Sequence, residues 1–227
     1  MLAYATPRLT FVVTVATFNI RHGLGRDGAV DLGRTAAALT ATRAGLVALQ
    51  EVDRFLPRSG GLDQTEELAA RTGMSGIFFP TLARGRGHYG LAVLADEPVE
   101  GHLEELPRVA GEEPRGMVIL PWRGVHVVAT HLAQRGEARD RQTEALAARA
   151  AALPPPVLVL GDLNQGLRTL TPLRDAGFHG GPHRATFSWG RQIDHVLVGP
   201  GLRLVDVRTV ATAASDHLPL VAEIEVF

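Results

Sequence analysis

Short runs of apolar residues, rich in valine, leucine and alanine, recur along the whole chain. Runs of this length, bounded by glycine, proline or charged residues, are typical of strands buried on at least one face. The predicted strands are residues 11–18, 46–50, 90–95, 117–121, 125–130, 157–161, 193–198, 202–209 and 220–226.

Three other stretches have the spacing of amphipathic helices. Asp31 can cap a helix that runs through Leu39, and Asp63 can cap one that stops at Gly73. A third helix is predicted over residues 137–153, which are rich in alanine, arginine and glutamate and end before a run of three prolines.

The predicted strands outnumber the helices, so strict alternation of strand and helix fails and a wholly parallel sheet is not expected. Mixed sheets with helices packed outside them fit better, which is an α/β (α+β) architecture. No internal repeat and no long linker divides the chain. We therefore expect a single domain spanning residues 1–227.

Polar side chains follow several of the predicted strands. Asn19 follows the first, Glu51 the second, and His131 the strand over 125–130. Each alone has a simpler explanation, because a charged strand end is usually solvated and asparagine is common in turns. Their repetition at strand ends indicates a scaffold that converges on one site.

The segment VLVLGDLNQ gives a sharper signal. An apolar strand runs into a glycine and then presents Asp162 and Asn164 two residues apart, on one side of the chain. Asp162 offers an anionic oxygen, and Asn164 offers both an amide donor and a carbonyl oxygen. A simple Asx turn explains these residues equally well when they are taken alone.

Two later segments place aspartate beside histidine. Asp194 precedes His195 at the start of one strand, and Asp216 precedes His217 just before the last strand. If the two strands are neighbours, Asp194 can accept a hydrogen bond from His217 and hold its tautomer, as catalytic imidazoles often require.

These residue types together predict phosphoester chemistry. Carboxylate and amide oxygens are hard ligands that suit Mg²⁺ or Mn²⁺ better than zinc. Such an ion binds a phosphoryl oxygen while imidazoles and amides contact the other oxygens. The candidate set is Asn19, Glu51, His131, Asp162, Asn164, Asp194, Asp216 and His217.

Composition narrows the range of partners. With 23 basic residues, all of them arginine, against 24 acidic ones, the net charge is -1, so no global positive field favours a long nucleic-acid track. The absence of cysteine excludes disulfides, thiolate zinc sites and cysteine nucleophiles. No apolar stretch approaches the roughly 20 residues of a membrane helix, so we expect a soluble, cytoplasmic protein.

The ordered segments TFNIRHG, LVALQEVD, YGLAVLA, EEPRGMV, VVATHL, VLVLGDLN, IDHVLV and SDHLPL resemble those of the endonuclease/exonuclease/phosphatase (DNase I-like) superfamily. This superfamily includes deoxyribonuclease I, abasic-site endonucleases, neutral sphingomyelinases and inositol-polyphosphate phosphatases. The resemblance spans residues 17–223. It implies a four-layer sandwich of two packed mixed β-sheets with helices on the outer faces.

The resemblance also implies a metal site. Asn19 and Glu51 would bind the divalent ion, Mg²⁺ or Mn²⁺, with Asp216 completing or supporting the site.

Roles at the phosphate follow from the same resemblance. Asp162 and Asn164 would align or deprotonate the attacking water, and His131 and Asn164 would contact the phosphate. His217, oriented by Asp194, would be a general base or a phosphate ligand, so Asp162 and His217 both stay candidates for the base. The implied reaction is in-line attack by water without a covalent intermediate.

Three positions bear on how far the resemblance extends. Arg115 in EPRG matches a common pattern and would contact the substrate, although an Arg-Gly step also shapes turns. Leu91 stands where relatives commonly have asparagine, which removes an amide that would touch substrate or support an imidazole. Arg21 stands where abasic-site endonucleases carry an acid, which weakens a DNA-repair assignment.

Three functions compete at this point. The favoured one is a phosphodiesterase or phosphatase acting on a small-molecule or lipid-headgroup phosphoester. A nuclease is the alternative, supported by Arg84, Arg86 and His88 in the glycine-rich ARGRGHYG segment, which is also typical of a solvated loop. A catalytically inactive binding protein is disfavoured by the full set of polar residues. Oligomeric state is left open.

Overall fold

The computed structural model describes residues 10–227 and contains two six-stranded β-sheets. In the first sheet β1 and β2 are parallel and every other neighbouring pair is antiparallel. In spatial order its strands are β11 (Leu202–Thr209), β12 (Leu220–Val226), β1 (Phe11–Asn19), β2 (Leu46–Arg54), β4 (Gly87–Ala95) and β3 (Ser75–Arg84).

The second sheet repeats this plan. Its strands β7 and β8 are parallel, and the remaining pairs are antiparallel. In spatial order it contains β5 (His102–Glu105), β6 (Gly116–Trp122), β7 (Val125–His131), β8 (Val157–Asp162), β10 (Asp194–Val198) and β9 (His179–Gly180). The expectation of mixed sheets is confirmed.

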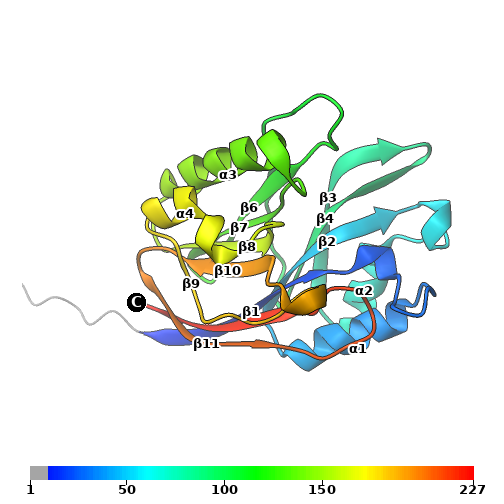
Figure 1. The fold of residues 1–227 in the computed structure, drawn as a ribbon. Helices are drawn as coiled ribbons and strands as arrows, with labels where there is room; N and C mark the ends of the chain where they lie inside the picture. Colours follow the sequence, from blue (N-terminus) through cyan, green and yellow to red (C-terminus); the bar gives the residue numbers. More distant parts are fainter. Residues whose placement is uncertain (1–9) are drawn as a thin grey trace, which may run out of the picture.

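The α-helices lie on the two outer faces, so the molecule has four layers (Figure 1). Helices α1 (Leu32–Thr42) and α2 (Gln64–Thr72) cover the first sheet, and α3 (Gly136–Ala151) and α4 (Thr171–Asp175) cover the second. The predicted sandwich is therefore confirmed. Within residues 10–227, no helix has the length and apolar character that crossing a membrane requires.

The alternation of side chains along a strand explains how three apolar layers form: one between the two sheets, and one between each sheet and its helices. Successive side chains of a strand point to opposite faces. In β1, Val15 therefore packs into the core between the two sheets, whereas Ala16 and Phe18 pack against α1 and α2. Strands buried on both faces read as continuous apolar runs, and this made the inner strands visible in the sequence.

The predicted helices and inner strands agree with the structure to within a few residues. Asp31 and Asp63 cap α1 and α2, each accepting hydrogen bonds from two backbone N–H groups. Three strands and one α-helix of the described residues were not predicted: β3, β5, β9 and α4. These strands are sheet edges; β3 contains Pro80, and β5 has the sequence HLEE, so neither has the apolar pattern of an inner strand.

One predicted boundary is wrong at a functional position. The strand expected to end at Gln50 continues to Arg54, so Glu51 lies inside β2 and not after it. The pairing of β2 with β4 shifts register between Leu49 and Val52, and Glu51 has a left-handed φ of 58°. This bulge turns the Glu51 side chain out of the regular alternation of the strand.

Gly161 permits the close approach of β7 and β8 directly before Asp162. Its φ is +150°, and a Cβ atom there would lie 2.0 Å from the backbone oxygen of Thr130 on β7. No side chain fits in that space, so glycine is required for Asp162 to leave the strand where it does.

We predict that Gly161→Ala lowers the free energy of unfolding by about 1–3 kcal/mol or more, because β7 must move to relieve the overlap. Urea denaturation measures this change. Gly166→Ala is the matched control, since a Cβ at Gly166 meets no atom within 4 Å and its φ is -76°; its effect should stay within about 0.5 kcal/mol. Equal stability of the two variants would contradict the steric explanation.

Candidate active site

The two parallel strand pairs end at a common edge of the sandwich, and this brings the polar strand ends together. Asn19 ends β1 next to Gln50 of β2, and His131 of β7 pairs with Asp162 of β8. Asp194, the first residue of β10, pairs with Asp162 from the other side. Residues far apart in the sequence are therefore side by side in both sheets.

Asn19 connects the two sheets through its side-chain amide. Its Nδ2 donates to Oε1 of Glu51 and to Oδ2 of Asp162, at 3.0 Å each, while its Oδ1 accepts from the backbone N–H of Arg21. Asp162 receives a further hydrogen bond on Oδ1 from the backbone N–H of Asn164. The amide thus sits between two carboxylates that belong to different sheets.

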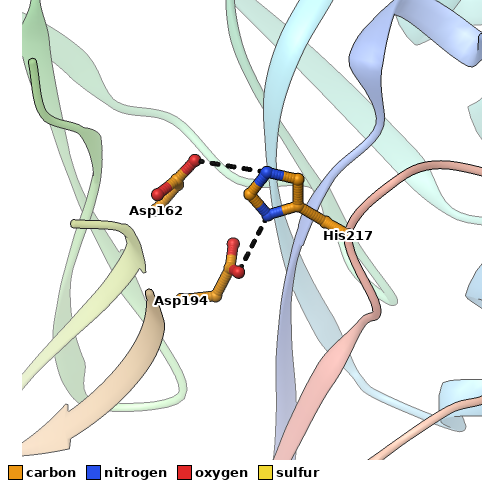
Figure 2. Close-up of side chains that lie close together, drawn as sticks. All are labelled: Asp162, Asp194 and His217. Atoms are coloured by element: carbon orange, nitrogen blue, oxygen red, sulfur yellow. Dashed lines mark hydrogen bonds and ion pairs between the residues drawn. The ribbon is translucent and has the colours of Figure 1, made fainter. Parts of the chain in front are cut away.

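His217 lies between two aspartates (Figure 2). Its Nδ1 donates to Oδ2 of Asp194 at 2.9 Å, and its Nε2 is 3.8 Å from Oδ2 of Asp162. Burial alone would lower the pKa of His217, but the Asp194 carboxylate, with smaller contributions from Asp162 and Asp216, raises it to about 9. The imidazole is therefore cationic at neutral pH.

The carboxyl of Asp162 is almost fully buried, with 1% of its surface exposed. Burial raises its pKa, and the neighbouring Asp194 carboxylate raises it further. His217 and the hydrogen bonds from Asn19 and Asn164 act in the opposite direction, and the pKa of Asp162 comes to about 7. This carboxyl changes its protonation state near neutral pH.

His131 has the opposite charge state from His217. Burial lowers the pKa of His131 well below its usual range, and the charges of Arg115 and His217 lower it further. Arg115 donates from its guanidinium to Nδ1 of His131 at 3.0 Å. Because Nδ1 accepts, the proton of the neutral ring is on Nε2, which lies 3.5 Å from Oδ2 of Asp162.

A cavity of about 450 Å³ opens over these groups. Of the predicted residues, Glu51, His131, Asp162, Asn164, Asp216 and His217 line it. Asn19 and Asp194 lie behind that lining and hold its carboxylates and imidazole. Arg115 also lies behind it, in contact with His131.

Leu91 and Arg115 lie beside each other next to His131. Leu91 has no side-chain amide, and the side-chain hydrogen bond to Nδ1 of His131 comes from the guanidinium of Arg115.

Two groups of side chains bear on metal binding. Among the described residues, one oxygen or nitrogen from each of Asp162, Asp194 and His217 lies within 4.8 Å of the others. In that group Nδ1 of His217 already donates a hydrogen bond to Asp194. Glu51 contributes a half-buried carboxylate on the other side of Asn19, and Asp216 faces the cavity with its Oδ2 3.7 Å from a nitrogen of Arg21.

Hard oxygen donors therefore surround the Asn19 side of the cavity, which suits a divalent cation such as Mg²⁺ or Mn²⁺. Among residues 10–227, no group hydrogen-bonds to Oδ1, the second and buried carboxylate oxygen of Asp194. This donor set satisfies the chemical requirement for such an ion.

The sequence did not single out the basic and aromatic part of the cavity. Phe187 packs its ring 4.7 Å from that of His217, and the guanidinium of Arg191 lies 5.8 Å from the Phe187 ring. Arg139 reaches the backbone oxygen of Asn164. The remaining lining residues on this side are Gln134, Arg135 and Ile193. Their only sequence signal is proximity to VVATHL and IDHVLV.

Several solved structures have folds similar to that of this chain. A structure from Beutenbergia cavernae described as an endonuclease/exonuclease/phosphatase superposes with a TM-score of 0.79 at 23% identity, covering 95% of this chain and 72% of that one. An AP endonuclease from Archaeoglobus fulgidus gives a TM-score of 0.68 at 20% identity, covering 92% and 98%. At these identities the likeness concerns the fold.

A sequence relative is the uncharacterized protein YbhP of Escherichia coli, which is 34% identical over 169 residues. The match covers 61% of this chain and 63% of YbhP, so it spans less than two thirds of that relative's length.

The sequence model of the Endonuclease/Exonuclease/phosphatase family matches residues 16–217, a range that begins beside Asn19 and ends at His217. Members of that family hydrolyse phosphoester bonds and are generally dependent on a divalent metal. The chain belongs to the endonuclease/exonuclease/phosphatase family.

Proposed function

We propose that the protein is a Mg²⁺- or Mn²⁺-dependent phosphoester hydrolase that directs water in line at a small-molecule or lipid-headgroup phosphoester. The observation that carries the proposal is the bridge from Glu51 through Asn19 to Asp162, with two histidines of opposite charge state around Asp162 in one cavity. A phosphate in this cavity would meet acidic, neutral and cationic groups at once.

Glu51, with Asn19 and Asp216, would hold the divalent ion. When bound, the ion neutralises charge on the phosphoryl oxygens and on the departing oxygen. Asn19 presents its amide nitrogen to both carboxylates, so ligation through its oxygen requires the amide to turn over and release the N–H of Arg21.

Asp162 is the better candidate for the base. A base is most effective when its pKa lies near the working pH, and the pKa of Asp162 is about 7. His217 has a pKa of about 9 and is already protonated, so it would instead donate to a phosphate oxygen. Asp194 holds its ring in place for that contact.

His131 would donate a second, uncharged hydrogen bond to the phosphate from its Nε2. Arg115 fixes this tautomer from behind by donating to Nδ1. We therefore assign Arg115 as a residue that positions His131, and Asn164 as one that aligns the water with Asp162.

A nuclease is the second candidate function. Arg84, Arg86 and His88 lie on the β3–β4 hairpin. In this alternative, they would contact the backbone of the bound nucleic acid. Arg84, however, is ion-paired with Glu113, which lowers the charge available to a polyanion. Arg21, which stands where abasic-site endonucleases carry an acid, is ion-paired with Asp216 beside the cavity.

The first test is hydrolysis of bis-p-nitrophenyl phosphate with added Mg²⁺ or Mn²⁺ and with a chelator. We expect metal-dependent turnover by the wild type. Glu51→Gln should raise the metal concentration needed for half-maximal rate by more than about tenfold, which corresponds to about 1.4 kcal/mol of lost ion binding. Glu144→Gln, an exposed acid on α3, is the matched control.

The same assays separate the alternatives. Full activity of Glu51→Gln at limiting metal would contradict its role as a ligand. Rapid nicking of supercoiled plasmid at physiological salt would favour the nuclease, and lack of metal-dependent turnover on every phosphoester would favour an inactive binding protein.

A pH prediction follows from the Asp194–His217 pair. The protonated imidazole is lost as pH rises through its raised pKa of about 9, so the rate should fall on that side. Asp194→Asn removes the charge that raises this pKa and should move the alkaline limb to lower pH by more than about one unit, or about 1.4 kcal/mol. NMR titration of His217 in metal-free protein provides an independent readout; an unchanged pKa would refute the assigned role of Asp194.

A stability prediction follows from Asp162. Its folded pKa of about 7 lies above the ordinary value of 3.8, so the native state binds more protons than the unfolded chain and stability falls as pH rises between these values. In chelator-treated protein, Asp162→Asn should gain in melting temperature relative to wild type between about pH 5 and about pH 8. Exposed Asp140→Asn should show no such trend. A constant difference for Asp162→Asn would contradict the raised pKa.

A further inference from the structure

A second cavity adjoins the candidate active site. It has a volume of about 520 Å³ and lies between the turn that follows Asn164 and the segment that leads into β10. Arg191 and Ile193 line both cavities, so these two residues form the boundary between them. The other lining residues are Gly166, Leu167, Arg168, Thr169, His183 and Gln192.

The lining of this second cavity combines apolar surface with positive charge. Leu167 and Ile193 supply hydrocarbon, and Arg168, Arg191 and His183 supply cationic or basic groups. In the part of the chain that the structure describes, no carboxylate lines it. Across residues 10–227, neither Arg168 nor Arg191 has an acidic side chain within ion-pair distance. The guanidinium groups are available to an external anion.

The two cavities differ in their charges. The lining of the first mixes Glu51, Asp162 and Asp216 with Arg135, Arg139 and His217, and a metal ion would add its charge there, whereas the charged side chains among residues 10–227 that line the second are all basic. A ligand that carries a single anionic group would need only the first cavity for binding. A ligand that extends past Arg191 meets charges that favour a second anion.

The boundary between the cavities is a fixed turn. Phe187 and Thr186 both donate backbone hydrogen bonds to the carbonyl of Arg191, and the Thr186 hydroxyl accepts from the backbone of Ile193. Gln192 is buried and accepts from the backbone N–H of Arg184. At the tip, Trp189 has a left-handed φ of 61° and is 94% exposed. The backbone that carries Arg191 is thus anchored on both sides of the turn, whereas the side chains of Arg168 and Arg191 are exposed to solvent.

On the basis of the proposed function, we propose that the second cavity is a substrate subsite for another anionic group, a carboxylate or a phosphate, carried on the organic part of the phosphoester. The scissile phosphate occupies the first cavity, the linking carbons pack on Ile193 and Leu167, and the second anion binds Arg168 and Arg191. His183 borders this subsite.

The test uses pairs of inhibitors that differ by one anion. Glycerol phosphate is compared with phosphoglycerate, in which a carboxylate replaces the hydroxymethyl group, and adenosine monophosphate with adenosine bisphosphate. Each is titrated against hydrolysis of bis-p-nitrophenyl phosphate. In at least one pair the second anion should improve inhibition about tenfold, as expected for one charge-assisted contact, and Arg168→Gln should abolish that gain.

Arg141→Gln is the control, because Arg141 is an exposed arginine on α3 outside both cavities and should leave the gain intact. Arg168→Glu should make the second anion unfavourable. A gain that survives Arg168→Gln would overturn the subsite, and so would the lack of any gain both in the soluble pairs and with the anionic lipid tested below. Absence of wild-type turnover would instead defeat the proposed function, so the two failures are distinguishable.

A lipid arm identifies the source of the anion. Phosphatidylcholine vesicles that contain phosphatidylserine are compared, as inhibitors, with vesicles that contain phosphatidylethanolamine. An Arg168-dependent gain from phosphatidylserine with none in the soluble pairs assigns the subsite to a lipid headgroup. The reverse result assigns it to a free metabolite. A gain in neither arm overturns the proposal.

Discussion

The burial of one carboxyl group, Asp162, is the constraint on which the site depends. A buried carboxylate is costly unless protein groups replace its lost water. Here its oxygens face Asn19, the backbone of Asn164, and the two imidazoles of His131 and His217. These groups come from both sheets, so the contacts of one carboxyl join the ends of the two sheets at one edge.

The same burial separates the charge states of the two imidazoles. His217 is buried against Asp194 and stays protonated, whereas His131 is buried against the guanidinium of Arg115 and stays neutral. Two histidines within reach of one oxygen can therefore contribute a charged and an uncharged hydrogen bond. Environment, and not residue type, assigns the two roles.

Charge is also divided along the surface. The chain has almost no net charge, yet the lining carboxylates Glu51, Asp162 and Asp216 all belong to one cavity, while the charged side chains among residues 10–227 that line the next are all basic, with Arg191 shared by both. The net charge of the chain therefore does not reflect the uneven distribution of charge between the two cavities. Such an arrangement discriminates among small ligands by the number and spacing of their anions, which a uniform positive surface does not do.

Local sequence signals were enough to predict the inner strands, the caps at Asp31 and Asp63, and the polar residue types at the strand ends, because apolar runs and capping side chains are confined to short segments. It did not determine the edge strands β3, β5 and β9, whose pairing depends on neighbours and not on apolar content. Glu51 was predicted to follow its strand, since a bulge has no signal in the local sequence.

Three contacts depend on how the chain folds in space: Asn19 lies between Glu51 and Asp162, Arg115 supports His131, and Arg191 separates two cavities. Each of these contacts joins segments distant in sequence, and their geometry is set by how the two sheets stack.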